Sequence, residues 1–83
     1  MVLPYEEIMS ISYVQIRCEV DHEELVMNEL KKIDSIKEMM RVMGSYDVVV
    51  KIEEESPSHV KKVISSRIRT VKNIKSTITL PTI

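Results

Sequence analysis

Phenylalanine and tryptophan are absent from this sequence of 83 residues, which has one glycine, one cysteine and three tyrosines. A single cysteine excludes an intrachain disulfide and any metal site built from several cysteines. No apolar run approaches the roughly 18 residues of a membrane-spanning helix. The N-terminus also lacks a basic segment followed by a hydrophobic stretch. We therefore predict a cytoplasmic protein that makes no contact with a membrane.

The charge balance is close to neutral, with 12 Lys and Arg against 13 Asp and Glu. This total offers no electrostatic argument for wrapping nucleic acid, so we expect no direct nucleic-acid partner. Hydrophobic residues make up 43% and charged residues 30% of the chain, a profile typical of one small globular domain. Its Ile, Val, Lys and Glu content suits a thermophile.

The core of such a domain is small, and here it has no large rings to fill it. Aliphatic side chains and methionine take that role, and such a core gains stability from area buried against a second subunit. The composition therefore favours an oligomer.

Residues 1–10 contain Pro4, and their apolar residues follow neither the helical nor the strand spacing, so we interpret them as an N-terminal arm. Residues 11–83 form the single domain. Its first strand, residues 11–20, places Val14, Ile16, Cys18 and Val20 on one face.

Asp21 followed by Glu24 has the spacing of a capping box and predicts a helix that ends near residues 32–34. The core face of this helix carries Val26, Leu30 and Ile33.

Three further strands and a second helix follow. The pattern predicts strands over residues 36–43 and 46–52, joined by Gly44-Ser45 in a two-residue type II′ turn. Ser56 before Pro57 is an N-cap followed by proline at the first helical position. The core face of this helix is Val60, Val63, Ile64 and Ile68, and a last strand covers residues 74–82.

The order βαββαβ predicts an α+β fold, the ferredoxin-like sandwich, with a four-stranded antiparallel sheet in the order 4-1-3-2. Both helices then cover one face of the sheet. The alternation predicts that the helix-free face displays Tyr13, Gln15, Arg17, Met39, Arg41, Val49, Lys51, Thr77 and Thr79. We expect this face to pack on another sheet.

Enzyme chemistry finds little support among these residues. His22 and His59 both fall in the first turn of a predicted helix, where a capping or solvated role is expected, and neither has metal ligands at the right spacing. Cys18 points to the core face of its strand and behaves there as a small hydrophobe. The acidic run of residues 53–55 is interpreted as a solvated loop. We predict no catalytic residues, no metal and no cofactor.

One group of residues does suggest a binding site. Asp47, Thr77 and Thr79 are expected on the helix-free face, beside a turn whose Gly44 exposes backbone N–H groups. Asp47 offers an anion for an ammonium group and the threonines offer hydroxyls, while adaptable apolar walls come from Met39, Met40 and Met43. Together they suit a small zwitterion. The alternative interpretation is that Asp47 is a turn acid and the threonines are plain β-formers.

At these positions the sequence resembles the RAM (regulation of amino acid metabolism) domain, the effector-binding module of leucine-responsive regulator/AsnC transcription regulators. The stretches Val42–Lys51 and Ile74–Thr79 carry the resemblance, which extends over residues 11–83. It implies ligand contacts at Met43, Gly44, Tyr46, Asp47, Thr77 and Thr79. It also implies homodimers that pack sheet to sheet, with effectors bound where dimers meet in an octamer or another ring.

The resemblance implies a non-enzymatic amino-acid-sensing module that acts in transcription regulation through oligomerisation. Full-length members begin with a DNA-binding helix-turn-helix, and the residues before Ile11 are too few for one. We therefore expect a stand-alone module that does not bind DNA specifically by itself and that assembles with a full-length regulator. Two alternatives stay open: an assembly partner without a ligand of its own, and a small dimeric-barrel enzyme.

Two departures from related patterns are visible in the sequence. Asn73 lies where the family often has glycine before the last strand, and asparagine tolerates the left-handed conformation that such a turn needs. The ACT domain, a structural cousin that also binds amino acids, usually has a glycine in the loop after the first strand. This chain has none there, which favours the RAM domain over the ACT domain.

Overall fold

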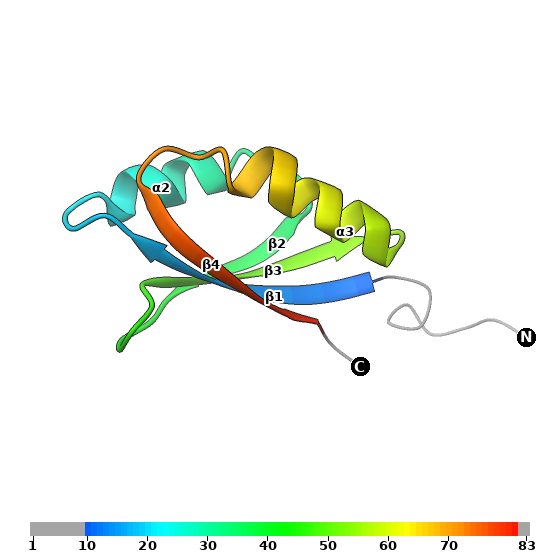
Figure 1. Cartoon of the computed structure of the whole chain (residues 1–83), viewed down its shortest axis with the longest axis horizontal. Helices are drawn as coiled ribbons and strands as arrows, with labels where there is room; N and C mark the ends of the chain where they lie inside the picture. The colour runs from blue at the N-terminus through cyan, green and yellow to red at the C-terminus, as the bar shows by residue number, and fades with distance from the viewer. Residues whose placement is uncertain (1–9, 82–83) are drawn as a thin grey trace, which may run out of the picture.

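This computed structural model describes residues 10–81, which follow the predicted order of elements (Figure 1). Apart from Ser10, the predicted N-terminal arm lies outside the described residues. The elements are β1 (Ser10–Cys18), α2 (Glu23–Leu30), β2 (Ile36–Arg41), β3 (Val48–Glu54), α3 (Pro57–Val63), the π-helical turn η1 (Ile64–Ile68) and β4 (Ile74–Pro81). Within this range no helix has the length and apolarity needed to cross a membrane.

The four strands form one antiparallel sheet in the order β2-β3-β1-β4. This confirms the predicted 4-1-3-2 order and the ferredoxin-like α+β fold. Both helices lie on the same side of the sheet, as Figure 1 shows, and no helix of the described residues covers the other side. The core lies between the two layers. Its fully buried members come from β1, β3 and both helices, and the largest are Ile16, Leu30, Ile52, Ile68, Val14, Val26, Val48 and Val50.

The start of α2 differs from the prediction. Asp21 has a φ of 65°, in the left-handed region, and the helix begins at Glu23 after His22, whose side chain makes no capping hydrogen bond. The predicted capping box of Asp21 and Glu24 is therefore wrong. The chain must turn sharply from the end of β1 into α2, and aspartate is one of the few residues that tolerate this conformation. The helix also ends at Leu30, earlier than predicted, although Ile33 beyond it remains buried.

The start of α3 confirms the prediction. The Ser56 hydroxyl accepts a hydrogen bond from the backbone N–H of His59 at 3.3 Å, and Pro57 is the first helical residue. The π turn η1 then lengthens one turn of the helix, with the N–H of Arg69 donating to the carbonyl of Ile64 at 2.9 Å.

The π turn decides which residue of the pair Arg67 and Ile68 enters the core. In a regular α-helix, seven residues make about two turns, so Arg67 would lie directly above Val60 on the core face. The wider turn instead buries Ile68 completely and leaves Arg67 exposed. The predicted core position of Ile68 is thus confirmed.

The helix-free face differs from the prediction at four positions. Thr79 and Thr77 pair with Val14 and Ile16 of β1 and therefore lie on the helix side of the sheet. Met39 and Arg41 lie on that side too, since they pair with the buried residues Val50 and Val48. In their place, the helix-free side carries Glu38 and Met40 of β2 and Ile78 and Leu80 of β4.

Two register shifts account for these differences. The β2–β3 pairing slips between Ile36 and Glu38, and the β1–β4 pairing slips between Arg17 and Cys18. Each bulge inserts one extra residue, which moves every later side chain of that strand to the opposite face. The predicted positions of Tyr13, Gln15 and Lys51 on the helix-free side remain correct, because β1 and β3 pair there without a shift.

The connection between β2 and β3 is longer than the predicted two-residue turn. β2 ends at Arg41 and β3 begins at Val48, so the connection is a loop of residues 42–47. The N–H of Val42 donates to the carbonyl of Asp47 at 2.9 Å across it. Gly44 has a φ of +112°, as predicted, and a Cβ at this position would meet no atom within 4 Å. Glycine is needed here for its backbone conformation, not for space.

Candidate functional site

Asp47 attaches the 42–47 loop to the end of β1. Its backbone N–H donates to the carbonyl of Ile16 at 2.9 Å, and its carboxylate Oδ2 accepts from the backbone N–H of Cys18 at 2.7 Å. These bonds continue the pairing of β1 and β3 one step beyond Val48, where the regular ladder ends. The structure therefore gives Asp47 a definite role in folding. A carboxylate has about four lone-pair sites, so this bond leaves acceptor capacity for a ligand.

The Cys18 thiol beside this bond is buried, which confirms its predicted place on the core face. Burial, together with the negative charges of Asp47 and Glu23, raises the pKa of Cys18 from its usual 9.0 to about 11. The thiol is therefore protonated at neutral pH. Because the thiolate is the reactive form of cysteine, Cys18 is not a nucleophile here.

The remaining loop residues differ widely in exposure. Met43 is 98% exposed and points away from the core, Gly44 and Ser45 are exposed, and Tyr46 is half-buried. An exposed methionine at the tip of a loop is an adaptable apolar contact surface. The structure thus brings Met43, Gly44, Tyr46 and Asp47 together in one loop, with an apolar tip and an anionic base.

Thr77 and Thr79 lie apart from this loop. Thr77 pairs with Ile16, whose other neighbour is Val48, so β1 separates β4 from β3. Two strand spacings amount to about 10 Å. Both threonines are half-buried on the helix side. One copy of the chain therefore does not gather all six predicted ligand residues around a single pocket.

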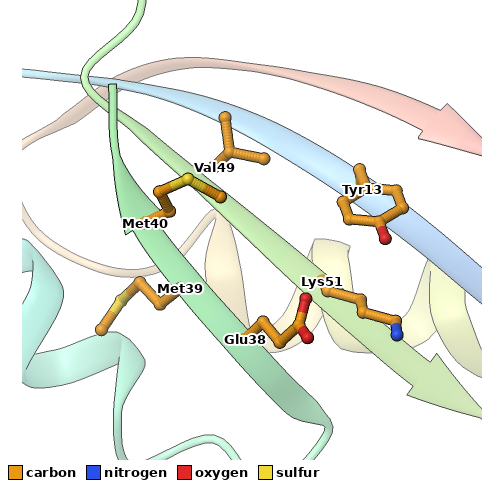
Figure 2. Close-up of a pocket in the computed structure, with 6 residues that line it drawn as sticks. All are labelled: Tyr13, Glu38, Met39, Met40, Val49 and Lys51. Atoms are coloured by element: carbon orange, nitrogen blue, oxygen red, sulfur yellow. The ribbon is translucent and has the colours of Figure 1, made fainter. Parts of the chain in front are cut away.

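The structure has a hollow elsewhere, on the helix-free side of β1, β2 and β3. Its volume is about 380 Å³, and it is lined by Tyr13, Glu38, Met39, Met40, Val49 and Lys51 (Figure 2). Of these residues, Met39 has its side chain packed against the core on the helix side. Figure 2 shows Glu38, Tyr13 and Lys51 with their polar ends on the same side of the sheet. Glu38 is the residue that sequence reasoning missed, because the β2 bulge brings it to this face.

Side chains cross this face of the sheet in two rows that follow the strand pairing. The first row runs over all four strands as Met40, Val49, Gln15 and Ile78, and the second as Glu38, Lys51, Tyr13 and Leu80. Three of the four outer members are large exposed hydrophobic residues: Met40 is 60%, Ile78 44% and Leu80 45% exposed. The fourth is the exposed carboxylate Glu38. The face is therefore apolar along β4 and at Met40, and it is polar along the second row from Glu38 to Tyr13.

Lys51 is the cation at the centre of that row. Partial burial lowers its pKa, but the electrostatic interactions with Glu38, Tyr13 and Glu53 outweigh this effect, and the pKa is raised overall. The Lys51 ammonium also lies 3.5 Å from Glu53 Oε1. Lys51 is thus a permanent cation at physiological pH, held between two carboxylates.

The two histidines have local partners. His22 Nδ1 lies 2.8 Å from the carbonyl of Val20, and His59 Nδ1 lies 3.0 Å from the Ser56 hydroxyl. Among residues 10–81, no group of three His, Cys, Asp or Glu side chains is arranged to hold a metal ion.

Comparison with known proteins places this geometry in a family. The family model described as the Lrp/AsnC ligand binding domain matches residues 11–83. Among curated proteins, the homocitrate synthase of Sulfurisphaera tokodaii is 34% identical over 67 residues. The match covers 80% of this chain but only 14% of that enzyme, so the chain spans about a seventh of the length of this relative.

Solved structures show the same fold. The crystal structure of FFRP-DM1 is 27% identical, with a TM-score of 0.85, and the match covers 89% of this chain and 99% of that one. The complex of the transcriptional regulator NMB0573 with L-Met, from Neisseria meningitidis, has a TM-score of 0.85. That match covers all of this chain and 56% of the regulator, and at 8% identity it shows a shared fold alone.

Proposed function

Because the chain belongs to the Lrp/AsnC ligand-binding domain family, we propose that it senses an amino acid and acts in transcription regulation through oligomerisation, without catalysing a reaction. The family match supports a regulatory domain, and a transcriptional regulator shares the fold. The proposal adds the class of ligand and the mode of action. A regulator of the same fold in complex with L-Met supports the choice of an amino acid.

The observation that carries this proposal is the 42–47 loop with Asp47 at its base. Asp47 uses one carboxylate oxygen to attach the loop to Cys18. A ligand ammonium bound by the same carboxylate would therefore directly affect the hydrogen bond at the end of β1. Backbone N–H groups around Gly44 are accessible to a ligand carboxylate, since the loop there is exposed. Met43 supplies apolar contact for a ligand side chain.

The proposed site is completed by other copies of the chain. We place a homodimer at the helix-free face, where the rows ending in Met40, Ile78 and Leu80 expose apolar area that a second sheet would bury. Dimers then assemble into an octamer or another ring, with the 42–47 loops at the contacts between dimers. In such a ring Thr77 and Thr79 of one copy need not lie in the same pocket as Asp47 of that copy.

A second candidate function is that of an assembly partner without its own ligand. The curated relative carries the matching region inside a much longer enzyme, which supports a module whose readout is provided by another protein. The partner would be a family member with the same domain, either a DNA-binding regulator or an enzyme. Co-purification that is insensitive to every amino acid would favour this candidate.

The test is thermal unfolding of the pure protein with each of the twenty amino acids, followed by light scattering after size exclusion for any ligand that shifts the transition. A ligand at about 100 times its Kd adds roughly 2.7 kcal/mol per site, or several degrees for a chain of this size. A shift from one or a few amino acids is expected. No shift from any of them, in a folded oligomer, would contradict the sensing function.

The variant that tests the role of the Asp47 charge is Asp47→Asn. This change keeps an oxygen that can accept from Cys18 and removes the negative charge that binds an ammonium group. We expect it to unfold at nearly the same temperature as the wild type without ligand and to lose the ligand-induced shift. An unchanged shift would remove Asp47 from the site.

A further inference from the structure

The near-neutral total charge hides an uneven distribution of the acidic residues along the chain. Residues 56–83 contain six of the 12 Lys and Arg and no Asp or Glu. All 13 Asp and Glu lie before residue 56, together with the other six cations. The two parts therefore carry formal charges of +6 and −7. The expectation that nucleic acid is no direct partner came from the total, which conceals this uneven distribution.

The six cations form one exposed segment of the fold. We call them the basic segment: Lys61, Lys62, Arg67, Arg69, Lys72 and Lys75, all exposed. They follow α3 and η1 across the outer surface of the helix layer and continue to the start of β4, from yellow to orange in Figure 1. The only ion pairs among residues 10–81 join other residues, Lys32 with Glu29 and Lys51 with Glu53. The charge of the basic segment is therefore not neutralised within the described part of the chain.

Exposed hydroxyls are interspersed with these cations. Ser65, Ser66 and Thr70 lie on the same outer surface, and their hydroxyls are held by backbone carbonyls, as in the 3.0 Å bond from Thr70 to Ser66. These hydroxyls already donate their one proton to the backbone, so contacts with the phosphate oxygens of a nucleic acid would come from the Lys and Arg side chains. The π turn contributes to this surface, since it turns Arg67 outward.

The surface around the basic segment lacks the exposed apolar side chains and the Phe, Tyr or Trp rings that a protein, a membrane or a single-stranded nucleic acid would contact. From residue 58 to residue 76 every exposed side chain is polar, and the large exposed hydrophobic residues all lie elsewhere: Val20, Leu25, Met40, Met43, Ile78 and Leu80. Protein interfaces and membrane-bound helices both use an apolar centre. The segment also has no Phe, Tyr or Trp on which single-stranded bases could stack. Among these partners, a double-stranded nucleic acid, with its regular array of phosphates, matches this polar, cationic surface best.

We propose that the basic segment binds the phosphate backbone of double-stranded DNA without reading its sequence. The helix formed by α3 and η1, of 7 and 5 residues, is roughly 18 Å long, while duplex DNA carries a negative charge about every 1.7 Å of its axis. Several cations therefore reach phosphates at once. This contact goes beyond the proposed sensing function and would keep the regulatory domain close to DNA.

Electrostatic binding of this kind has a measurable signature. Each neutralised phosphate releases condensed counterions, so the logarithm of the binding constant falls with the logarithm of the salt concentration, with a slope of about −0.9 per phosphate. With five or six contacts per protomer we expect a slope of roughly −5. A dimer that uses two segments would give a steeper slope.

The experiment is fluorescence anisotropy of a labelled random-sequence duplex with the full chain, at several salt concentrations between about 50 and 200 mM. The test variant is Lys61→Gln/Arg67→Gln/Lys72→Gln. The matched control, Lys31→Gln/Lys32→Gln/Lys37→Gln, removes the same charge from three exposed cations in the acidic part of the chain. Thermal unfolding of both variants checks that they fold.

We expect salt-dependent binding of the wild type. The test variant should lose affinity by at least about tenfold and about 3 units of slope, at 0.9 per contact, whereas the control should change affinity by less than about threefold. Three results would overturn the proposal: no salt-dependent binding of the wild type, an equal loss in both variants, or tighter binding to polyglutamate than to DNA. The last result would assign the basic segment to an acidic protein.

Discussion

The carboxylate of Asp47 accepts a 2.7 Å hydrogen bond from the backbone N–H of Cys18, 29 positions earlier in the chain. This bond joins the 42–47 loop to the end of β1 where the strand ladder of β1 and β3 has stopped. It makes Asp47 a structural residue and, at the same time, the anion that the proposed function needs. The two roles predict different consequences for two substitutions.

Asp47→Ala is expected to destabilise the fold by about 1 to 3 kcal/mol, because it leaves the partly buried N–H of Cys18 without an acceptor. Asp47→Asn keeps an acceptor oxygen and should cost less than half as much. Urea unfolding of the two variants measures the difference. Equal losses would show that the charge of Asp47, and not the hydrogen bond, stabilises the loop.

Gly44→Ala is expected to cost about 1 to 2 kcal/mol, since a residue with a Cβ is strained at a φ of +112° although the space is open. Ser45→Ala, at the exposed neighbouring position, should stay within about 0.5 kcal/mol of the wild type. Chemical denaturation compares them. A neutral Gly44→Ala would mean that the loop readily adopts another conformation.

The raised pKa of Cys18 predicts a loss of stability at alkaline pH. Below pH 9 the thiol is protonated in both the folded and the unfolded state. Between pH 9 and about 11 only the unfolded state ionises, so the free energy of unfolding should fall, by on the order of 2 kcal/mol in total. The measurement is urea unfolding from pH 8 to pH 11.

Cys18→Ala is the control for this pH dependence, because it removes the thiol and retains all the lysines that also titrate in this range. Its stability should be lower at pH 8 and should fall less steeply above pH 9. Identical slopes for the two proteins would assign the alkaline loss to groups other than Cys18.

The π turn makes opposite predictions for two adjacent residues. Ile68→Ala should cost about 2 to 5 kcal/mol, because the side chain is fully buried. Arg67→Ala should change stability by no more than about 0.5 kcal/mol, because the side chain is exposed. Thermal unfolding of the pair checks the π turn directly. A regular α-helix would reverse much of this difference.

The proposed homodimer is tested by Ile78→Asp on the helix-free face. A buried carboxylate without a partner is costly, so the variant should elute with the mass of a monomer in size exclusion with light scattering. Leu25→Asp is the control, since Leu25 is 57% exposed on α2, away from that face. Loss of the oligomer in the control, or its retention in Ile78→Asp, would contradict sheet-to-sheet packing.

The sequence was sufficient for much of this fold. Residue alternation and helical spacing identified all four strands and both helices, and the Ser56-Pro57 pair located the start of α3. Val14, Ile16 and Cys18 were predicted from alternation alone and are buried, because β1 pairs with β3 without an interruption. Val20, predicted on the same face, is wrong: β1 ends at Cys18, and Val20 beyond it is 76% exposed. Such local patterns depend only on neighbouring residues, which a sequence displays in full.

The candidate site was predicted less completely. Gly44 and Asp47 were correctly predicted to lie close together at the hairpin end, but Asp47 belongs to the 42–47 loop and not to the predicted strand of residues 46–52. Thr77 and Thr79 were assigned to the wrong side of the sheet, and Glu38 was not anticipated there. All three errors have one cause, the two bulges, since inserting a single residue reverses the direction of every later side chain in a strand.

The sequence by itself determined the order of elements, the apolar residues available for the core, and the uneven distribution of the acidic residues along the chain, because these depend on residue type and spacing. Only the tertiary structure decided which side chains share a face and which meet across long separations, such as Asp47 with Cys18. Bulges and π turns arise from the fit between the helices and the sheet. That fit is a property of packing and has no local pattern in the sequence.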